Sequence, residues 1–72
     1  MMVWVNGTFD LLHRGHIELF KYAGGFGDVI VGIDFDERVK LLKGDSRPVN
    51  TFEDRKFILE SIKYIKKVVS RI

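Results

Sequence analysis

The chain has 72 residues, no cysteine and a formal net charge of +2 at pH 7, which allows one small domain and excludes a disulfide framework and thiolate chemistry. It lacks both a signal-peptide pattern and an apolar segment near the roughly 20 residues that cross a bilayer, so we expect a cytoplasmic protein with no membrane partner. The net charge is too small to indicate a nucleic-acid partner, and the basic residues near the C-terminus are more typical of a solvated helix end than of a binding patch.

The first half of the chain predicts a strand, a helix and a second strand. Residues 3–5 are a β-branched and aromatic run that stops at a turn signal, which predicts a first strand. From about Gly15 the apolar residues recur at helical spacing, and we expect the glycines of 24–27 to end this helix in left-handed conformations. Residues 29–33 are almost continuously apolar, as is typical of a parallel strand covered on both faces.

The second half predicts two helices separated by a loop. Residues 34–42 indicate a loop and a short helix, and residues 43–50, with the one proline of the sequence, indicate a loop. Thr51 has the position of an N-cap before an acidic first turn, which predicts a further helix. The residues that we expect on the apolar faces of these two helices are Val39, Leu41, Leu42, Phe57, Ile58, Ile62 and Ile65.

Residues 68–69 complete the pattern as a short third strand. The order strand, helix, strand, helix, strand predicts a parallel sheet with right-handed crossovers. This is a Rossmann-like α/β architecture, the N-terminal half of a doubly wound fold, in which ligands bind at the carboxyl ends of the strands. We expect residues 1–72 to form a single domain.

The segment that carries chemistry reads GTFDLLHRGH from Gly7 to His16, where the first strand should meet the first helix. The spacing of His13 and His16 places both imidazoles on one face of the first helical turn. That turn also offers unpaired backbone N–H groups and the positive end of the helix dipole, a ready site for phosphate. Thr8 adds a hydroxyl, and Gly7 and Gly15 let the backbone approach a ligand closely. Donors that converge in this way suit attack on phosphorus, because negative charge develops in the transition state.

Other interpretations explain less of this segment. A zinc site would need a third ligand, and no residue at the usual spacing supplies one, so we expect no metal held by the protein. A histidine nucleophile would need an orienting partner, which the sequence does not identify. A single histidine here would most often only cap the helix, but capping does not account for the whole string. The glycines of 24–27 follow a helix instead of a strand, which argues against a dinucleotide fingerprint.

Gly7–Asp10 followed by His13–His16 resembles the HxGH signature of the cytidylyltransferase-like nucleotidyltransferase superfamily. Residues Thr51–Tyr64 resemble the second helix of glycerol-3-phosphate cytidylyltransferases. Residues Lys43–Asn50 are more similar to the corresponding loop of heptose-phosphate adenylyltransferases. The resemblance covers nearly the whole chain and implies that residues 1–72 are a nucleotidyltransferase domain, truncated or naturally short.

The resemblance implies roles in donor binding for the residues that match the family motif. His13 and His16 would contact the nucleotide phosphates and stabilise the pentavalent transition state. Thr8 and the backbone of Phe9 would help to bind the triphosphate. Lys43 resembles the mobile-loop lysine of the family, which reaches the α-phosphate.

Three further positions follow from the same resemblance. Arg55 resembles the second-helix arginine that faces the active site, and would bind nucleotide phosphate. Asp10 would organise the loop or the acceptor site. Asp36 comes after the second strand, where family members place a carboxylate on the acceptor side.

The implied reaction is in-line attack by a phosphate oxygen of the acceptor on the α-phosphorus of a nucleoside triphosphate, with loss of pyrophosphate and Mg²⁺ on the nucleotide. We expect transfer of CMP from CTP to a small phosphorylated polyol or sugar, such as glycerol 3-phosphate. Transfer of AMP from ATP to a sugar phosphate of the heptose-phosphate type stays open. A catalytically incomplete half-domain that only binds a nucleotide or phosphate stays open as well.

The resemblance also implies a second half, whose strands and late Ser/Thr-rich motif would complete the nucleotide pocket. Without it, the strand at residues 3–6 would form an exposed edge of the sheet, which is prone to pairing. We therefore expect a homodimer, or a partner chain, that covers the side of the missing half.

Overall fold

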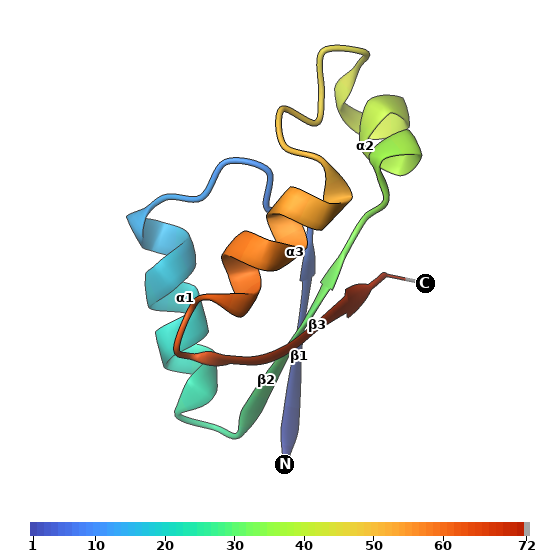
Figure 1. Ribbon diagram of the computed structural model, residues 1–72. Coiled ribbons are helices and arrows are strands. Elements are labelled where there is room, and N and C mark those ends of the chain that lie inside the picture. Colours follow the sequence, from blue (N-terminus) through green and yellow to red (C-terminus); the bar gives the residue numbers. More distant parts are fainter. Residues whose placement is uncertain (72) are drawn as a thin grey trace.

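The computed structural model describes residues 1–71, which form a three-stranded sheet and three helices (Figure 1). The strands and helices are β1 (Met2–Gly7), α1 (Arg14–Gly24), β2 (Asp28–Ile33), α2 (Asp36–Lys43), α3 (Phe52–Glu60) and β3 (Ile65–Ser70). The strands are parallel and lie in the order β1-β2-β3. The predicted Rossmann-like α/β fold is confirmed.

The register of the strands brings their carboxyl ends level with one another. Gly7, the last residue of β1, lies opposite Ile33, the last residue of β2. Ile33 in turn lies opposite Ser70, the last residue of β3. The segments that follow all three strands therefore begin at one edge of the sheet, where ligands of this fold class bind.

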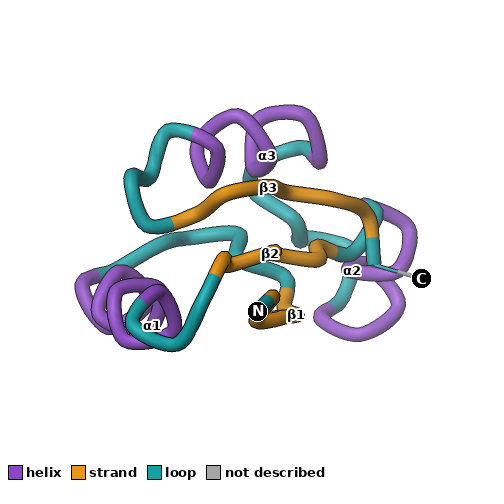
Figure 2. The backbone as a smooth tube through the Cα atoms, turned by 90° about the horizontal axis from the view of Figure 1, so that it is seen from below, coloured by secondary structure: helices purple, strands orange, loops and turns teal. Residues whose placement is uncertain are grey.

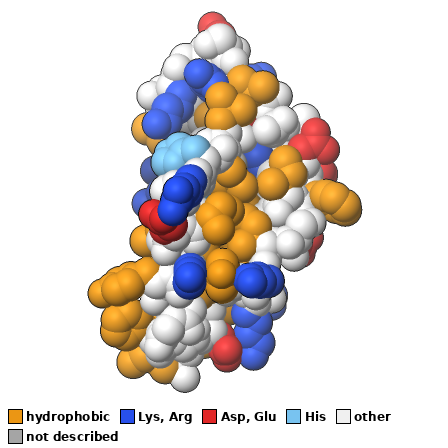
Figure 3. Space-filling view, turned by 90° about the vertical axis from the view of Figure 1, so that its left-hand side faces the viewer, with side chains coloured by type: hydrophobic (Ala, Val, Ile, Leu, Met, Phe, Trp, Pro, Cys, Tyr) orange, Lys and Arg blue, Asp and Glu red, His pale blue; other side chains and the backbone are white. Residues whose placement is uncertain are grey.

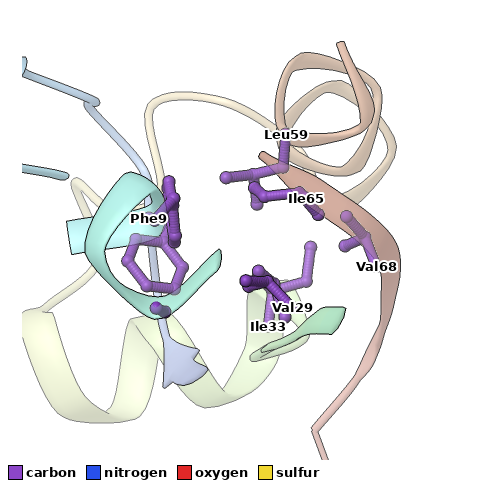
Figure 4. Packing of buried hydrophobic residues seen from close by; sticks show 9 residues of the cluster. Phe9, Val29, Ile33, Leu59, Ile65 and Val68 are labelled. Atoms are coloured by element: carbon purple, nitrogen blue, oxygen red, sulfur yellow. The ribbon is translucent and has the colours of Figure 1, made fainter. Parts of the chain in front are cut away.

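The core lies between one face of the sheet and the helices α1 and α3. Phe20 of α1 and Leu59 of α3 are fully buried and belong to one cluster with residues of β2 and β3. Figure 4 shows Leu59, Val29 and Phe9 turned toward the same interior. In Figure 2, α1 and α2 lie on opposite sides of the strands. Burial of a leucine or phenylalanine side chain stabilises the fold by about 1.5–3 kcal/mol, so these contacts hold α1 and α3 in place.

The buried face of α3 leads to a direct prediction. Leu59→Ala should lower the free energy of unfolding by about 2–5 kcal/mol, because the substitution leaves a cavity in the core. Phe57→Ala is the matched control in the same helix, since Phe57 is 73% exposed and its loss should change stability by at most about 0.5 kcal/mol. Urea denaturation measures both. Equal losses in the two variants would contradict the packing of α3.

The apolar faces predicted for α2 and α3 are partly wrong. In α2, Val39 is fully buried, but Leu41 and Leu42 are exposed. In α3, the buried residues are Arg55 and Leu59, so the helix turns a face to the core other than the one predicted. The reason is that a helix of eight or nine residues can bury only a narrow stripe, and the spacing of apolar residues does not fix which stripe it is.

The ends of the elements agree with the sequence in part. Thr51 caps α3 as predicted, because its Oγ1 accepts a hydrogen bond of 3.2 Å from the N–H of Asp54. The third strand is longer than predicted and begins at Ile65, which had been assigned to the preceding helix. The glycines of 24–27 do end α1, but Gly25 is right-handed at φ −71°. Among the described glycines only Gly44, after α2, has a positive φ, of 97°.

The free edge of β1 agrees with the expectation for residues 3–6, since β1 is an outer strand of the sheet. Met2 and Trp4 are 62% and 57% exposed. Within residues 1–71 there is no helix with the length and apolarity needed to span a bilayer.

Candidate active site

The predicted phosphate loop connects the carboxyl end of β1 to the start of α1 (Figure 1). Phe9 opens the loop at φ 49°, in the left-handed region that residues other than glycine rarely adopt. Its ring is buried 5.3 Å from the ring of Phe20, and it meets the ring of His16 edge-on at 5.5 Å. A Cβ at Gly7 would lie 2.8 Å from the Phe9 ring. Gly7 is therefore needed for the packing of Phe9, which in turn supports His16.

The two histidines begin α1 by capping it. His13 is the N-cap residue, and its Nδ1 accepts a hydrogen bond of 3.0 Å from the N–H of Gly15. The Nδ1 of His16 accepts a bond of 3.1 Å from the N–H of His13. This is the geometry of a capping box, with imidazoles in place of the usual hydroxyl and carboxylate. The ring centroids of the two histidines are 4.0 Å apart, so the predicted placement on one face is correct.

This cap determines which nitrogens remain for a ligand. A ring nitrogen that accepts a hydrogen bond carries no proton, so each neutral imidazole carries its proton on Nε2. Both Nε2–H groups are then donors directed away from the cap. Capping and ligand binding, which the sequence presented as alternatives, are thus compatible because they use different nitrogens of each ring.

The same geometry corrects the expectation of unpaired amides at the start of α1. The N–H groups of His13 and Gly15 donate to the imidazoles, and those of His16 and Ile17 donate to the carbonyl oxygen of His13. The imidazole Nε2–H groups, more than the backbone, are therefore the donors that this turn offers.

Acid should loosen the start of α1. Partial burial and the charge of His13 hold the pKa of His16 below its ordinary value of 6.5. On acidification the unfolded chain takes up the proton first, so the stability contributed by His16 is complete above pH 6.5 and is lost as the pH falls through the lowered pKa. The midpoint of urea unfolding should drop more for this chain than for His16→Gln between about pH 7.5 and about pH 5. An equal drop in both chains would show that His16 is not the titrating group.

A cavity of about 530 Å³ lies beside this loop. The predicted site residues that line it are Gly7, Thr8, Phe9, Asp10, His16 and Lys43. His13 adjoins it through its contact with His16. The sequence did not single out Arg47, which also lines the cavity. Figure 3 shows histidine at the surface of this side of the molecule, with Lys and Arg side chains above and below it.

Arg55 does not line this cavity. Its side chain is fully buried and donates to the carbonyl oxygens of Asn50 at 3.1 Å and Thr8 at 2.9 Å. It also donates to Oδ1 of Asp36 at 2.8 Å. The sequence around Arg55 is typical of a surface charge, but its side chain is fully buried. In this conformation the guanidinium joins the phosphate loop to the starts of α2 and α3.

Asp10 fixes the loop that precedes α3. Its carboxylate accepts hydrogen bonds from the backbone N–H groups of Val49 at 2.7 Å and Asn50 at 2.8 Å, and Arg47 lies 3.7 Å away. Burial raises the pKa of Asp10, but the bonds from Asn50 and Val49 and the charge of Arg47 outweigh it and hold that pKa below 3.8. In the structure Asp10 therefore fixes the loop between α2 and α3.

The fold and the site define a Rossmann-like α/β protein in which His16, with His13 beside it, lies at a cavity next to the carboxyl end of β1. Comparison with known families agrees with this class. The model of the family described as cytidylyltransferase-like matches residues 4–71. The chain belongs to this family, as the sequence motif predicted.

The chain is similar to a set of longer bacterial proteins. It is 45% identical over 69 residues to the bifunctional protein HldE of Aliarcobacter butzleri, and 48% identical over 69 residues to that of Sulfurimonas denitrificans. Each match covers 94% of this chain and 14% of the relative. The chain thus spans about one seventh of the length of these relatives.

A solved structure shares the fold. The lipopolysaccharide core biosynthesis protein from Thermoplasma volcanium superposes with a TM-score of 0.86 at 22% sequence identity. The superposition covers all of this chain and 58% of the other chain.

Proposed function

We propose that this chain carries the phosphate-handling part of a nucleotidyltransferase, which moves a nucleotidyl group from a nucleoside triphosphate to a small phosphorylated acceptor. The observation that carries this proposal is the pair of imidazoles, 4.0 Å apart, whose Nδ1 atoms are both engaged by the backbone. The cap orients both rings before a ligand arrives. Donors fixed in advance stabilise the charge of a transition state without the cost of reorganisation.

In the proposed reaction, an oxygen of the acceptor phosphate attacks the α-phosphorus of the triphosphate. The bond between this phosphorus and the bridging oxygen of the β-phosphate breaks, and pyrophosphate leaves with the electron pair. His13 and His16 would donate from Nε2 to phosphate oxygens, and Lys43 and Arg47, which line the same cavity as His16, would add positive charge. Thr8 and the backbone of Phe9 complete the triphosphate side of the cavity.

Magnesium would enter this site bound to the triphosphate. Within residues 1–71 no three His, Cys, Asp or Glu side chains are grouped as metal ligands. The nitrogen donors that line the cavity are the imidazole of His16 and the side chains of Lys43 and Arg47, which suit phosphate oxygens, and the carboxylate of Asp10, which also lines it, is engaged by Val49, Asn50 and Arg47. Mg²⁺ would supply neutralisation of the phosphate charge, while the residues of this chain bind and orient the phosphates.

We assign Arg55 and Asp10 as positioning residues. Arg55 has donors engaged with Thr8, Asn50 and Asp36, so we propose that it acts on the phosphates through Thr8 and not by contact. Asp10 holds the loop that carries Arg47. Asp36 has a side chain that is 32% exposed, and we retain it as the acceptor-side carboxylate.

For the donor, we favour ATP and a sugar phosphate over CTP and glycerol 3-phosphate. The sequence analysis favoured CTP because of the resemblance of Thr51–Tyr64. However, the HldE relatives match 94% of this chain, which takes in both the loop Lys43–Asn50 and residues Thr51–Tyr64, and neither relative is named as a cytidylyltransferase. We therefore give more weight to the resemblance of the loop Lys43–Asn50 to heptose-phosphate adenylyltransferases than to that of Thr51–Tyr64 to cytidylyltransferases.

Release of pyrophosphate tests the proposal. The chain is incubated with each of ATP, CTP, GTP and UTP together with Mg²⁺, and with glycerol 3-phosphate or a sugar 1-phosphate as acceptor. We expect release that depends on both substrates and is fastest with ATP and the sugar phosphate. Preserved triphosphate binding without release would favour the second candidate, a phosphate-binding half-domain, because the chain spans 58% of its structural neighbour. Absence of both binding and release would refute the proposal.

We also propose that a second copy, or a partner chain, covers the free edge of β1. Exposed apolar residues on this outer strand, Met2 and Trp4, support the proposal, because such edges tend to pair. Light scattering after size exclusion should show a dimer at micromolar concentration. A stable monomer would contradict self-association.

A further inference from the structure

A buried carboxyl group lies beside the proposed site without taking part in it. Asp34 follows β2 directly and is 2% exposed. Its Oδ2 accepts a hydrogen bond of 3.5 Å from the hydroxyl of Thr8, which lines the cavity. Its Oδ1 is buried and has no hydrogen-bond partner in the described part of the chain. A buried carboxylate without a full set of hydrogen-bond donors destabilises the folded state, so neighbouring groups are expected to compensate its charge.

Two arginines approach this unpaired oxygen. Nε of Arg38, in α2, lies 3.4 Å from Oδ1 of Asp34, and NH1 of Arg71, after β3, lies 3.9 Å from the same atom. Neither contact is a hydrogen bond. The arginine side chains are 58% and 41% exposed, so their guanidinium groups keep donors that face solvent.

The sheet itself brings these residues together. Thr8, Asp34 and Arg71 each come one residue after the level at which β1, β2 and β3 end side by side. The N–H of Arg71 donates to the carbonyl oxygen of Ile33 at 2.8 Å, which fixes residue 71 beside Asp34. The cluster of Asp34, Arg38 and Arg71 is thus a product of the fold and adjoins the cavity through Thr8.

We propose that Arg38 and Arg71 form a second anion subsite, which binds the phosphate of the acceptor while the histidines hold the phosphates of the donor. This inference rests on the proposed function. Asp34 holds the two guanidinium groups near each other and offsets one of their two charges. The remaining positive charge and the planar donors of arginine match a phosphate monoester, which arginine binds in a two-pronged manner.

The alternative is that the arginines only neutralise Asp34. One arginine in hydrogen-bond contact would be enough for that purpose. The structure instead has two arginines at longer distances, 3.4 and 3.9 Å, with more than a third of each side chain exposed. This arrangement leaves donors for a ligand.

The subsite can be tested by NMR on the isotope-labelled chain. Inorganic phosphate, and separately glycerol 3-phosphate, is titrated into the chain, first alone and then saturated with a non-hydrolysable ATP analogue, and the side-chain Nε–H signals of the arginines are followed. We expect the signals of Arg38 and Arg71 to shift with both probes, and that of Arg14, which is 91% exposed on α1, to stay unchanged. Arg38→Gln and Arg71→Gln should each weaken phosphate binding about 10-fold, while Arg14→Gln should not.

Two results would overturn the subsite. Arginine signals that do not respond to either probe would mean that Arg38 and Arg71 serve only Asp34. A response that disappears when the ATP analogue is present would mean that the arginines bind the triphosphate. The histidine signals separate this test from the proposed function. If the analogue shifts the histidine signals while the arginine signals do not respond to phosphate, only the subsite fails. If the arginine signals respond but the histidine signals never do, the proposed function fails, and Arg38 and Arg71 form an anion site without the role of binding an acceptor.

Discussion

His16→Ala is expected to lower the rate of nucleotidyl transfer by about 10²–10³-fold, the usual loss when one fixed donor to a transition state is removed. His16 lines the cavity, and its Nδ1 is engaged by the N–H of His13, so its Nε2–H is the group that can reach a phosphate. The initial rate of pyrophosphate release at saturating substrates measures the effect. Because the donor acts in the transition state, kcat should fall more than KM rises.

The capping role of His16 requires a second variant. Alanine also removes the acceptor for the N–H of His13, which costs about 0.5–2 kcal/mol of stability. His16→Gln keeps an acceptor at this third position of the helix, where glutamine commonly completes a capping box. We expect His16→Gln to regain the stability that alanine loses while its turnover stays low. Full turnover in the glutamine variant would show that His16 is only a cap.

Arg55→Met is expected to lower the free energy of unfolding by about 2–4 kcal/mol, an effect as large as that of a substitution in the apolar core. The substitution keeps the apolar volume but leaves the carbonyl oxygens of Thr8 and Asn50 without their donor. It also separates Asp36 from its partner. Loss of one member of a fully buried pair costs about 3–5 kcal/mol, and the lower figure allows for the partial exposure of Asp36. Urea denaturation followed by circular dichroism measures the loss.

Two further variants separate the buried network from general charge effects. Arg14→Met removes an exposed ion pair with Glu18 and should change stability by less than about 1 kcal/mol. Arg55→Lys should recover little, because an ammonium group cannot reproduce the planar set of donors that contacts Asn50, Thr8 and Asp36. Full stability in Arg55→Lys would mean that only the charge matters.

Local patterns were enough to predict the first two strands and the loop that borders the candidate site. The apolar runs at 29–33 and 3–5 indicated the two strands between which α1 crosses, although β1 continues through the expected turn to Gly7. The spacing of His13 and His16 predicted adjacent rings because both lie within one helical turn, where geometry is independent of the rest of the fold. The cap of Thr51 was predictable for the same reason.

Contacts between distant segments were not predictable in this way. Arg55 forms hydrogen bonds with Thr8, which is 47 positions away in the sequence, and with Asp36, which is 19 positions away. Nothing in the adjacent sequence distinguishes Arg55 from a surface arginine. Asp10 accepts hydrogen bonds from the backbone N–H groups of Val49 and Asn50, which are 39 and 40 positions away in the sequence. The approach of Arg38 and Arg71 to Asp34 depends on the register of β3, which the sequence did not predict, and the start of this strand was predicted three residues late.

The burial of apolar residues was predicted less well in the short helices than in the strands. Phe57 is exposed while Leu59, two positions away, is fully buried. Leu59 of α3 packs in one cluster with Ile65 and Val68 of β3. Which side of α3 is buried therefore depends on residues of β3 and cannot be predicted from the sequence of α3 alone. The sequence supplied hydrophobic residues on several faces, and the fold used one of them.

The protonation of the histidine rings tests the central claim most directly. Nitrogen chemical shifts of both imidazoles, recorded above pH 6.5 with and without a non-hydrolysable ATP analogue and Mg²⁺, report which ring nitrogen carries the proton and whether the ligand reaches it. We expect both His13 and His16 to hold the proton on Nε2 in the free chain, and both Nε2 signals to shift when the analogue binds. Protons on Nδ1, or Nε2 signals that do not respond to the analogue, would contradict the proposal that these capped histidines are the phosphate donors of the site.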